Sequence, residues 1–195
     1  MGSTGLIVLA AGASTRLGQP KQLLPYRGSN LLQITVESAI ASVCQPIVVV
    51  LGAYAEKIQP AIAQLPVQFV QNERWAVGMG TSIRCGLRCL ETDYQPIDAV
   101  VLLVCDQPFI TPHLINRLVE TYRTTGNSIV ASAYANTVGV PVLFSSKLFP
   151  TLNTLAKEGA KPIIKRHRSE VATVSFPDGK IDIDTPTEAQ KWLGH

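Results

Sequence analysis

The chain has 195 residues, of which 46% are hydrophobic and 16% are charged, so we expect one sizeable core and exclude a disordered chain. Its net charge of +3 is too small and too scattered to indicate a nucleic-acid partner, and it suits a small anionic substrate. No apolar run reaches the ~18 residues of a membrane span and no signal-peptide pattern is present, so we expect a cytoplasmic protein without a membrane partner.

The first expected strand, Leu6–Ala10, leads into a loop of small residues followed by two cations, Arg16 and Lys21. The backbone N–H groups of such a loop can approach an anion closely, and arginine and lysine add charge and directed donors. The loop therefore predicts a triphosphate cradle with Arg16 and Lys21 as catalytic cations. An ordinary glycine-containing turn is the alternative, but it would not need these cations. The nucleotide-binding residues expected here are Leu9, Ala10, Ala11, Gly12, Ala13, Ser14, Arg16 and Lys21.

Apolar runs and helical patterns alternate along the rest of the chain. The further strands expected are Pro46–Leu51, Val67–Gln71, Ala99–Val104, Ser128–Ala133, Val142–Phe144 and Val171–Phe176. The helices expected are Leu31–Val43, Ala55–Gln64, Gly80–Leu90, Pro112–Thr124, Ala160–His167 and Pro186–Trp192. Continuous apolar strands are typical of parallel strands covered on both faces, so the pattern predicts a three-layer α/β/α sandwich with a mostly parallel sheet. We expect one domain, 1–195, with a nucleotide-binding part over about 1–110 and an acceptor-binding part over about 111–195.

A second glycine-containing loop precedes the helix expected over Gly80–Leu90. Its glycines would let the backbone come close to a flat or bulky ligand, and the N-terminus of the helix would face that ligand. A loop followed by a helix cap, without a ligand, is the alternative. The nucleotide-binding residues expected in this loop are Gly78, Met79, Gly80, Thr81 and Ser82.

Asp106 follows the strongest apolar run of the chain, the strand expected over Ala99–Val104. A carboxylate at the tip of a buried strand needs a partner, and Mg²⁺ prefers carboxylate, phosphate and water oxygens. Asp106 is therefore an expected metal ligand and catalytic residue. The alternative is a cap for the following helix, although Thr111 and Pro112 already mark the start of that helix.

A second acidic site lies near the C-terminus, in an expected short strand that contains Asp182 and Asp184. We expect only one of the two to share a pocket with Asp106. Asp184, at the junction with the last helix, is the expected second metal ligand, and a simple helix cap is the alternative.

The motifs together resemble those of the MobA-like nucleotidyltransferases. Every fixed position of the family pattern L-A-A-G-x-S-x-R-x-G-x-P-K is filled between Leu9 and Lys21. Asp106-Gln107-Pro108 resembles the family's D-Q-P motif, and the segment from Asp182 to Pro186 resembles its D-I-D-T-P motif. The resemblance runs from Leu6 to about Glu188 and is closer to the molybdenum cofactor cytidylyltransferase branch. It implies the nucleotide-diphospho-sugar transferase fold, which is GT-A-like and Rossmann-like.

Two weaker matches fall on the acceptor side. Residues 139–144 resemble a G-x-P-x-x-F segment with Val140 where histidine is common, and Lys161 replaces the arginine of a G-A-R segment. Thr187 and Glu188 also stand where the family has Glu-Asp. The acceptor-binding residues that the resemblance implies are Gln107, Pro108, Gly139, Pro141 and Lys161.

The resemblance also implies a reaction. Bound Mg²⁺ on Asp106 and Asp184 would assist transfer of CMP from CTP, or of another nucleotide from its triphosphate. The acceptor would be the terminal phosphate of molybdenum-loaded molybdopterin, and pyrophosphate would leave. A molybdoenzyme would then receive the dinucleotide product. Two alternatives remain open: transfer to a sugar or alditol phosphate, and a non-catalytic protein that carries or inserts the molybdenum cofactor.

Overall fold

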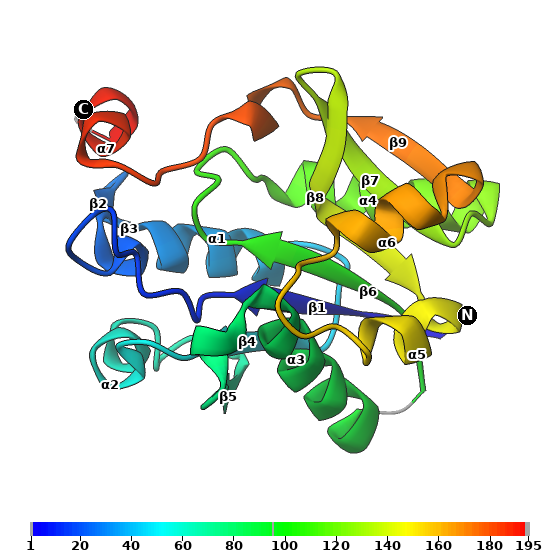
Figure 1. Ribbon diagram of the computed structural model, residues 1–195, viewed down its shortest axis with the longest axis horizontal. Helices are drawn as coiled ribbons and strands as arrows, with labels where there is room; N and C mark the ends of the chain where they lie inside the picture. The colour runs from blue at the N-terminus through cyan, green and yellow to red at the C-terminus, as the bar shows by residue number, and fades with distance from the viewer. Residues whose placement is uncertain (1, 95, 194–195) are drawn as a thin grey trace.

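A seven-stranded sheet runs through the middle of the computed structural model, which describes residues 2–94 and 96–193 (Figure 1). The strand order is β5-β4-β1-β6-β8-β7-β9. The strands of this sheet are β1 (Ser3–Leu9), β4 (Ile47–Leu51), β5 (Gln68–Gln71), β6 (Ile97–Val104), β7 (Ile129–Tyr134), β8 (Thr137–Ser145) and β9 (Val171–Ser175). A small separate ribbon pairs β2 (Pro25–Tyr26) with β3 (Ser29–Asn30).

The sheet is mostly parallel, as the apolar strands predict. β1 pairs in parallel with β4 and β6, and β4 pairs in parallel with β5. Only β8, among the described strands of this sheet, runs antiparallel, and it lies between β6 and β7. The carboxyl ends of β1 and β6 therefore lie side by side, where a ligand site is expected in such a sheet.

Helices cover both faces of the sheet. The helices are α1 (Leu31–Ile40), α2 (Ala55–Ile58), α3 (Met79–Asp93), α4 (Pro112–Thr125), α5 (Phe149–Leu152), α6 (Lys161–Arg166) and α7 (Pro186–Leu193). Alternate residues of β1 point to opposite faces of the sheet. Leu6 and Val8 pack with α1, α2 and α4, whereas Ile7 packs with α3, α5 and α6. The predicted three-layer α/β/α sandwich is therefore confirmed.

A third, smaller apolar cluster joins the two ends of the chain. Leu17 and Tyr26 from the first loop region pack with Ile181 and Ile183, and Trp192 of α7 covers the cluster. Figure 1 shows α7 on the same side of the molecule as β2 and β3. This packing brings the C-terminal segment to the carboxyl edge of the sheet.

The seven strands and six helices that were expected by residue range are present, with ends shifted by a few residues. The second helix is shorter than expected, because α2 passes into a 3₁₀ turn over Gln59–Ala61 that contains Pro60. The expected short strand around Asp182 is wrong. That segment pairs with no neighbouring strand in the described structure, although its backbone alternates buried Ile181 and Ile183 with outward-facing aspartates. None of the described helices has both the length and the apolar character that crossing a membrane requires.

Candidate functional site

The loop after β1 is held in shape by one buried glutamine. Nε2 of Gln22 donates hydrogen bonds to the carbonyl oxygens of Ala10 at 2.7 Å and Gly12 at 3.0 Å. The backbone N–H of Lys21 donates to Oγ of Ser14 at 3.1 Å, which closes the loop at its other end. Two carbonyl groups of the loop therefore face Gln22.

The N–H groups of this loop remain available for a ligand. No residue in the described ranges accepts a hydrogen bond from the backbone N–H groups of residues 12–16. Ser14 has a φ of 52°, in the left-handed region that turns successive N–H groups toward one side. This arrangement fits an anion such as a phosphate.

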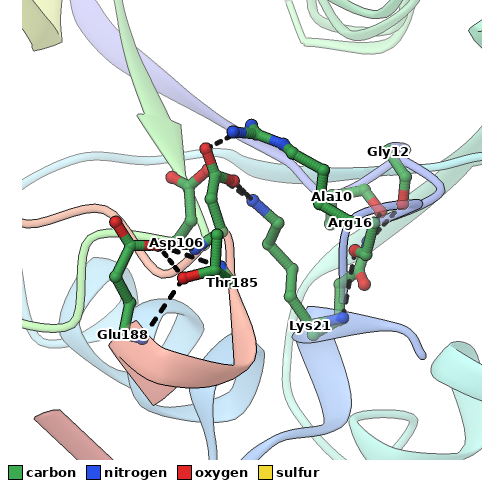
Figure 2. Close-up of polar contacts among 10 residues, drawn as sticks. Ala10, Gly12, Arg16, Lys21, Asp106, Thr185 and Glu188 are labelled. Carbon is green, nitrogen blue, oxygen red and sulfur yellow. Dashed lines mark hydrogen bonds and ion pairs between the residues drawn. The ribbon is translucent and has the colours of Figure 1, made fainter. Parts of the chain in front are cut away.

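Two cations and two carboxylates meet at the carboxyl edge of the sheet (Figure 2). Nζ of Lys21 lies 2.9 Å from Oδ2 of Asp106 and also donates to Oδ1 of Asp184. Nη2 of Arg16 donates to Oδ2 of Asp184 at 2.6 Å. The side chain of Lys21 is only 12% exposed, whereas that of Arg16 is 69% exposed. The Lys21 contacts are therefore the better protected from solvent screening.

Asp184 is positioned by its backbone. The N–H of Ile183 donates to the carbonyl oxygen of Asp106 at 2.9 Å, which ties the segment to the end of β6. Oε2 of Glu188 accepts hydrogen bonds from the N–H groups of Asp184 and Thr185 and from Oγ1 of Thr185. This is a capping box at the start of α7, in which the Thr185 hydroxyl accepts from the N–H of Glu188.

Lys21 and Asp184 stabilise each other's charged forms. Burial alone would lower the pKa of Lys21, but the charge of Asp106 and hydrogen bonds to both aspartates outweigh it and raise that pKa. Burial alone would raise the pKa of Asp184, but Lys21 and Arg16 hold it below its ordinary value. Lys21 and Asp184 are therefore both ionised at neutral pH.

A cavity of about 380 Å³ opens beside these charges. Nine of the expected site residues line it: Leu9, Ala11, Gly12, Arg16, Lys21, Met79, Ser82, Asp106 and Asp184. Trp75, which the sequence did not indicate, also lines it. The remaining expected nucleotide-binding residues lie outside its lining: Ala10, Ala13, Ser14, Gly78, Gly80 and Thr81.

Burial and the charge of Asp106 raise the pKa of the Cys105 thiol, also in the lining, to about 12, so it is no nucleophile at neutral pH.

Gly78, just before α3, and Gly80, in its first turn, are required by contacts within the protein. A Cβ at Gly80 would lie 2.6 Å from the carbonyl oxygen of Glu158, and a Cβ at Gly78 would collide with the backbone of Lys157. Nδ2 of Asn72 donates to the hydroxyls of Thr81 and Ser82, at 2.8 and 2.9 Å. The close approach that we expected for a ligand is, at both glycines, an approach of residues 156–159.

A second cavity of about 300 Å³ adjoins the first and shares Met79, Val104 and Asp106 with it. Three expected acceptor-binding residues line this second cavity: Gln107, Gly139 and Lys161. Pro108 is buried and Pro141 lies within β8, and neither lines the second cavity. Asp106 therefore stands where the two cavities meet.

Asp182 lines a cavity, although the sequence favoured Asp184 as the residue that shares a pocket with Asp106. It lines the second cavity with Asp106, whereas Asp184 lines the first. The expectation that only one of the two would share a pocket with Asp106 is wrong, because residues two apart in an extended segment lie on the same face. Burial and the charge of Asp106 raise the pKa of Asp182.

Sequence reasoning missed several residues that line or support the site, among them Gln22, Trp75, Asp182 and Glu188. A signal existed for two of them. Thr185-Pro186-Thr187-Glu188 has the spacing of a capping box, and the i, i+2 spacing of Asp182 and Asp184 predicts a shared face. Nothing local distinguishes Gln22 from a surface glutamine.

Asp106 and Asp184 have the chemistry of a divalent-metal pair. Their carboxylates converge on a single cationic atom, Nζ of Lys21, so a cation fits between them. Within the described residues, no group of three or more His, Cys, Asp or Glu side chains could hold a metal. A pair of carboxylates can hold Mg²⁺ or a similar ion, because such an ion is commonly bound by one or two carboxylates and completes its shell with phosphate and water oxygens.

Comparison with known proteins identifies the family of this chain. The family model of the MobA-like NTP transferase domain matches residues 6–171. Nicotine blue oxidoreductase of Paenarthrobacter nicotinovorans is 30% identical over 98% of both chains. Purine catabolism protein PucB of Bacillus subtilis is 30% identical over 93% of this chain and 92% of its own.

A solved structure is similar along the whole chain. Rv0371c of Mycobacterium tuberculosis is 28% identical with a TM-score of 0.84, covering 100% of this chain and 98% of its own, and it has also been solved with manganese. The resemblance read from the sequence motifs is thus confirmed over most of the chain. This chain belongs to the MobA-like NTP transferase family and is a nucleotidyltransferase.

Proposed function

We propose that this enzyme transfers CMP from CTP to the terminal phosphate of molybdenum-loaded molybdopterin, forming molybdopterin cytosine dinucleotide and pyrophosphate. The observation that carries the proposal is the position of Asp106, at the junction of two cavities and in contact with Lys21. A donor in one cavity and an acceptor in the other would meet beside this carboxylate. The donor would bind mainly to about residues 1–110 and the acceptor mainly to about residues 111–195.

In the donor cavity, the free N–H groups of residues 12–16 and the side chain of Arg16 would hold the β- and γ-phosphates. Lys21 would neutralise the charge that develops around the α-phosphorus. Met79 and Ser82 line the wall of the same cavity and would contact the nucleoside.

In the acceptor cavity, Gln107, Gly139, Lys161 and Asp182 would orient the second substrate. An oxygen of the acceptor phosphate would attack the α-phosphorus while the bond to the β-phosphate oxygen breaks. The phosphate monoester is already ionised at neutral pH, so the protein needs no general base. Positioning and charge neutralisation are then its main contributions.

Asp106 and Asp184 would hold the metal, which we propose to be Mg²⁺. When bound, Mg²⁺ supplies charge neutralisation at the donor phosphates and the attacking oxygen. Removal of divalent metal with a chelator should therefore abolish pyrophosphate release.

The same chemistry could serve a sugar phosphate or an alditol phosphate, and a carrier of finished cofactor would need no chemistry at all. The names of the two full-length relatives refer to nicotine blue and to purine catabolism, so they leave the acceptor open. Lys21, Arg16, Asp106 and Asp184 all meet at one cavity, which favours an enzyme over a carrier. We place the enzyme in the cytoplasm and expect a molybdoenzyme to receive its product.

The deciding experiment measures pyrophosphate release by the purified protein with Mg²⁺ and molybdenum-loaded molybdopterin. CTP, GTP, ATP and UTP are compared as donors, and sugar and alditol phosphates are then substituted as acceptors. Release with CTP and the pterin supports the proposal. Release only with a sugar or alditol phosphate would replace the acceptor, and no release above background with any pair would support the carrier.

A further inference from the structure

Lys21 already occupies the place between the two aspartates. Its Nζ atom lies 2.9 Å from Oδ2 of Asp106 and contacts Oδ1 of Asp184. Its side chain is 12% exposed, and those of the aspartates are 24% and 28% exposed. The ammonium group is therefore enclosed by the carboxylates that we assign to the metal.

Two carboxylates this close together need a positive charge between them, because their mutual repulsion is weakly screened at a partly buried site. An ammonium group and a divalent ion both satisfy that need, but they cannot occupy the same point. Arg16 cannot replace Lys21, since it contacts Asp184 alone and is 69% exposed.

We propose that Lys21 is a built-in competitor of the metal: it holds the cation position in the nucleotide-free enzyme and yields it when the triphosphate binds. This inference rests on the proposed function, which assigns the metal to Asp106 and Asp184. The triphosphate offers Lys21 a new anionic partner in the same cavity, so the side chain can leave the aspartates without losing its ion pair. Binding of the nucleotide then strengthens binding of the metal, and the reverse, because both ligands favour the state in which Lys21 has left the two aspartates.

The test measures Mn²⁺ binding to the nucleotide-free protein, by the electron paramagnetic resonance signal of free Mn²⁺. Lys21→Met removes the ammonium and keeps the length of the side chain. We expect it to bind Mn²⁺ at least ~10-fold more tightly than the wild type, within the range of typical coupling between ligands. Lys21→Gln, which can still donate a hydrogen bond to a carboxylate, should show the same direction if Lys21→Met does not fold.

Lys57→Met is the matched control, since Lys57 lies in α2 over the Tyr54 ring and its loss changes the net charge equally. It should bind Mn²⁺ as the wild type does. Adding Asp106→Asn to Lys21→Met should cancel the gain, which places the ion at the aspartates.

Equal or weaker Mn²⁺ binding by folded Lys21→Met and Lys21→Gln would overturn the inference. A gain that persists with Asp106→Asn would also overturn it, because the ion would then bind elsewhere. These outcomes are separate from the proposed function, since they need no acceptor and no turnover. A protein that releases no pyrophosphate with any acceptor can still show the Mn²⁺ response.

Discussion

Asp106 lies where the two cavities meet. Its carboxylate contacts Lys21 and lines both the first and the second cavity. Asp106→Asn should lower pyrophosphate release at saturating substrate by at least ~100-fold, the usual cost of losing one preorganised electrostatic contact. Asp98→Asn is the matched control, because Asp98 lies on the same strand, β6, and lines neither cavity. Its carboxylate accepts a hydrogen bond from the backbone N–H of Gly2, and its carbonyl oxygen accepts one from the Tyr122 hydroxyl. A near-normal rate for Asp106→Asn would remove this carboxylate from the chemistry.

A substitution at Asp182 should affect binding of the acceptor but not binding of the donor. It lines the second cavity, which we propose for the acceptor, and it is absent from the lining of the first, which we propose for the donor. Asp182→Asn should raise the KM for the acceptor about 10-fold and leave the KM for CTP unchanged, as expected for loss of one charged hydrogen bond to a bound ligand. Steady-state kinetics with each substrate varied in turn would measure the split. Equal effects on both KM values would contradict the assignment.

At the scale of elements, the start of α3 depends on a glycine that faces protein. Gly78 has a φ of 146°, and an added Cβ would meet the backbone of Lys157. Gly78→Ala should reduce the free energy of unfolding by at least ~2 kcal/mol, because backbone strain and steric overlap add. Gly126→Ala, at a φ of 69° with open space around it, should cost less. Urea unfolding of both variants would test this order, and equal losses would count against the steric argument.

The start of α7 depends on Glu188, and its contribution should vary with pH. Hydrogen bonds from the N–H groups of Asp184 and Thr185 hold the pKa of Glu188 below its ordinary value of 4.5. Glu188→Ala should lower the free energy of unfolding by about 1 kcal/mol at pH 7, the usual value of a helix cap.

The sign of that pH effect follows from the order of the two protonation steps. Below pH 4.5 the unfolded chain takes up the Glu188 proton before the folded protein does, so the contribution of Glu188 disappears as the pH falls. The stability difference between wild type and Glu188→Ala should therefore be constant above about pH 5 and should shrink below it. Urea titrations at several pH values would measure it, and a difference that grows on acidification would contradict the capping box.

Elements with a continuous apolar run or a helix-start signal were predictable, and those without either were not. β1, β4 and β6 are continuous apolar runs, and α4 begins at Thr111-Pro112, so their positions follow from the sequence. α5 has only four residues, too few for a helical period, and the β2–β3 ribbon is equally short.

The same division applies to the candidate site. Asp106 stands out as a costly charge at the end of an apolar strand, Lys21 as a cation after a loop of small residues, and Asp184 as a carboxylate before the last helix, so all three could be proposed from the sequence. Gln22 acts through two backbone carbonyls that come to it only in the folded loop. Gly78 and Gly80, at the start of α3, are required by contacts with residues 156–159, almost eighty positions away, which no local pattern reveals.

At the scale of the whole molecule, the candidate site is assembled from both halves of the chain. Lys21 follows the first strand, Asp106 follows β6, and Asp184 arrives after β9 through the apolar cluster of Ile181 and Ile183. A ligand that contacts all three segments therefore binds the folded state and not its separated parts. Such binding must appear as global stabilisation.

CTP with Mg²⁺ should accordingly raise the melting temperature. At 100 times its Kd, a ligand adds about 2.7 kcal/mol, which corresponds to about 5–10 °C for a domain of this size. The same scan with GTP, ATP and UTP would rank the bases without any acceptor. Gly12→Ala is the control that separates binding from folding: a Cβ there has open space on the protein side, yet Gly12 lines the donor cavity. Its melting temperature without ligand should match the wild type, whereas its shift with CTP should be smaller. A shift of equal size in both proteins would mean that the triphosphate binds away from the loop after β1.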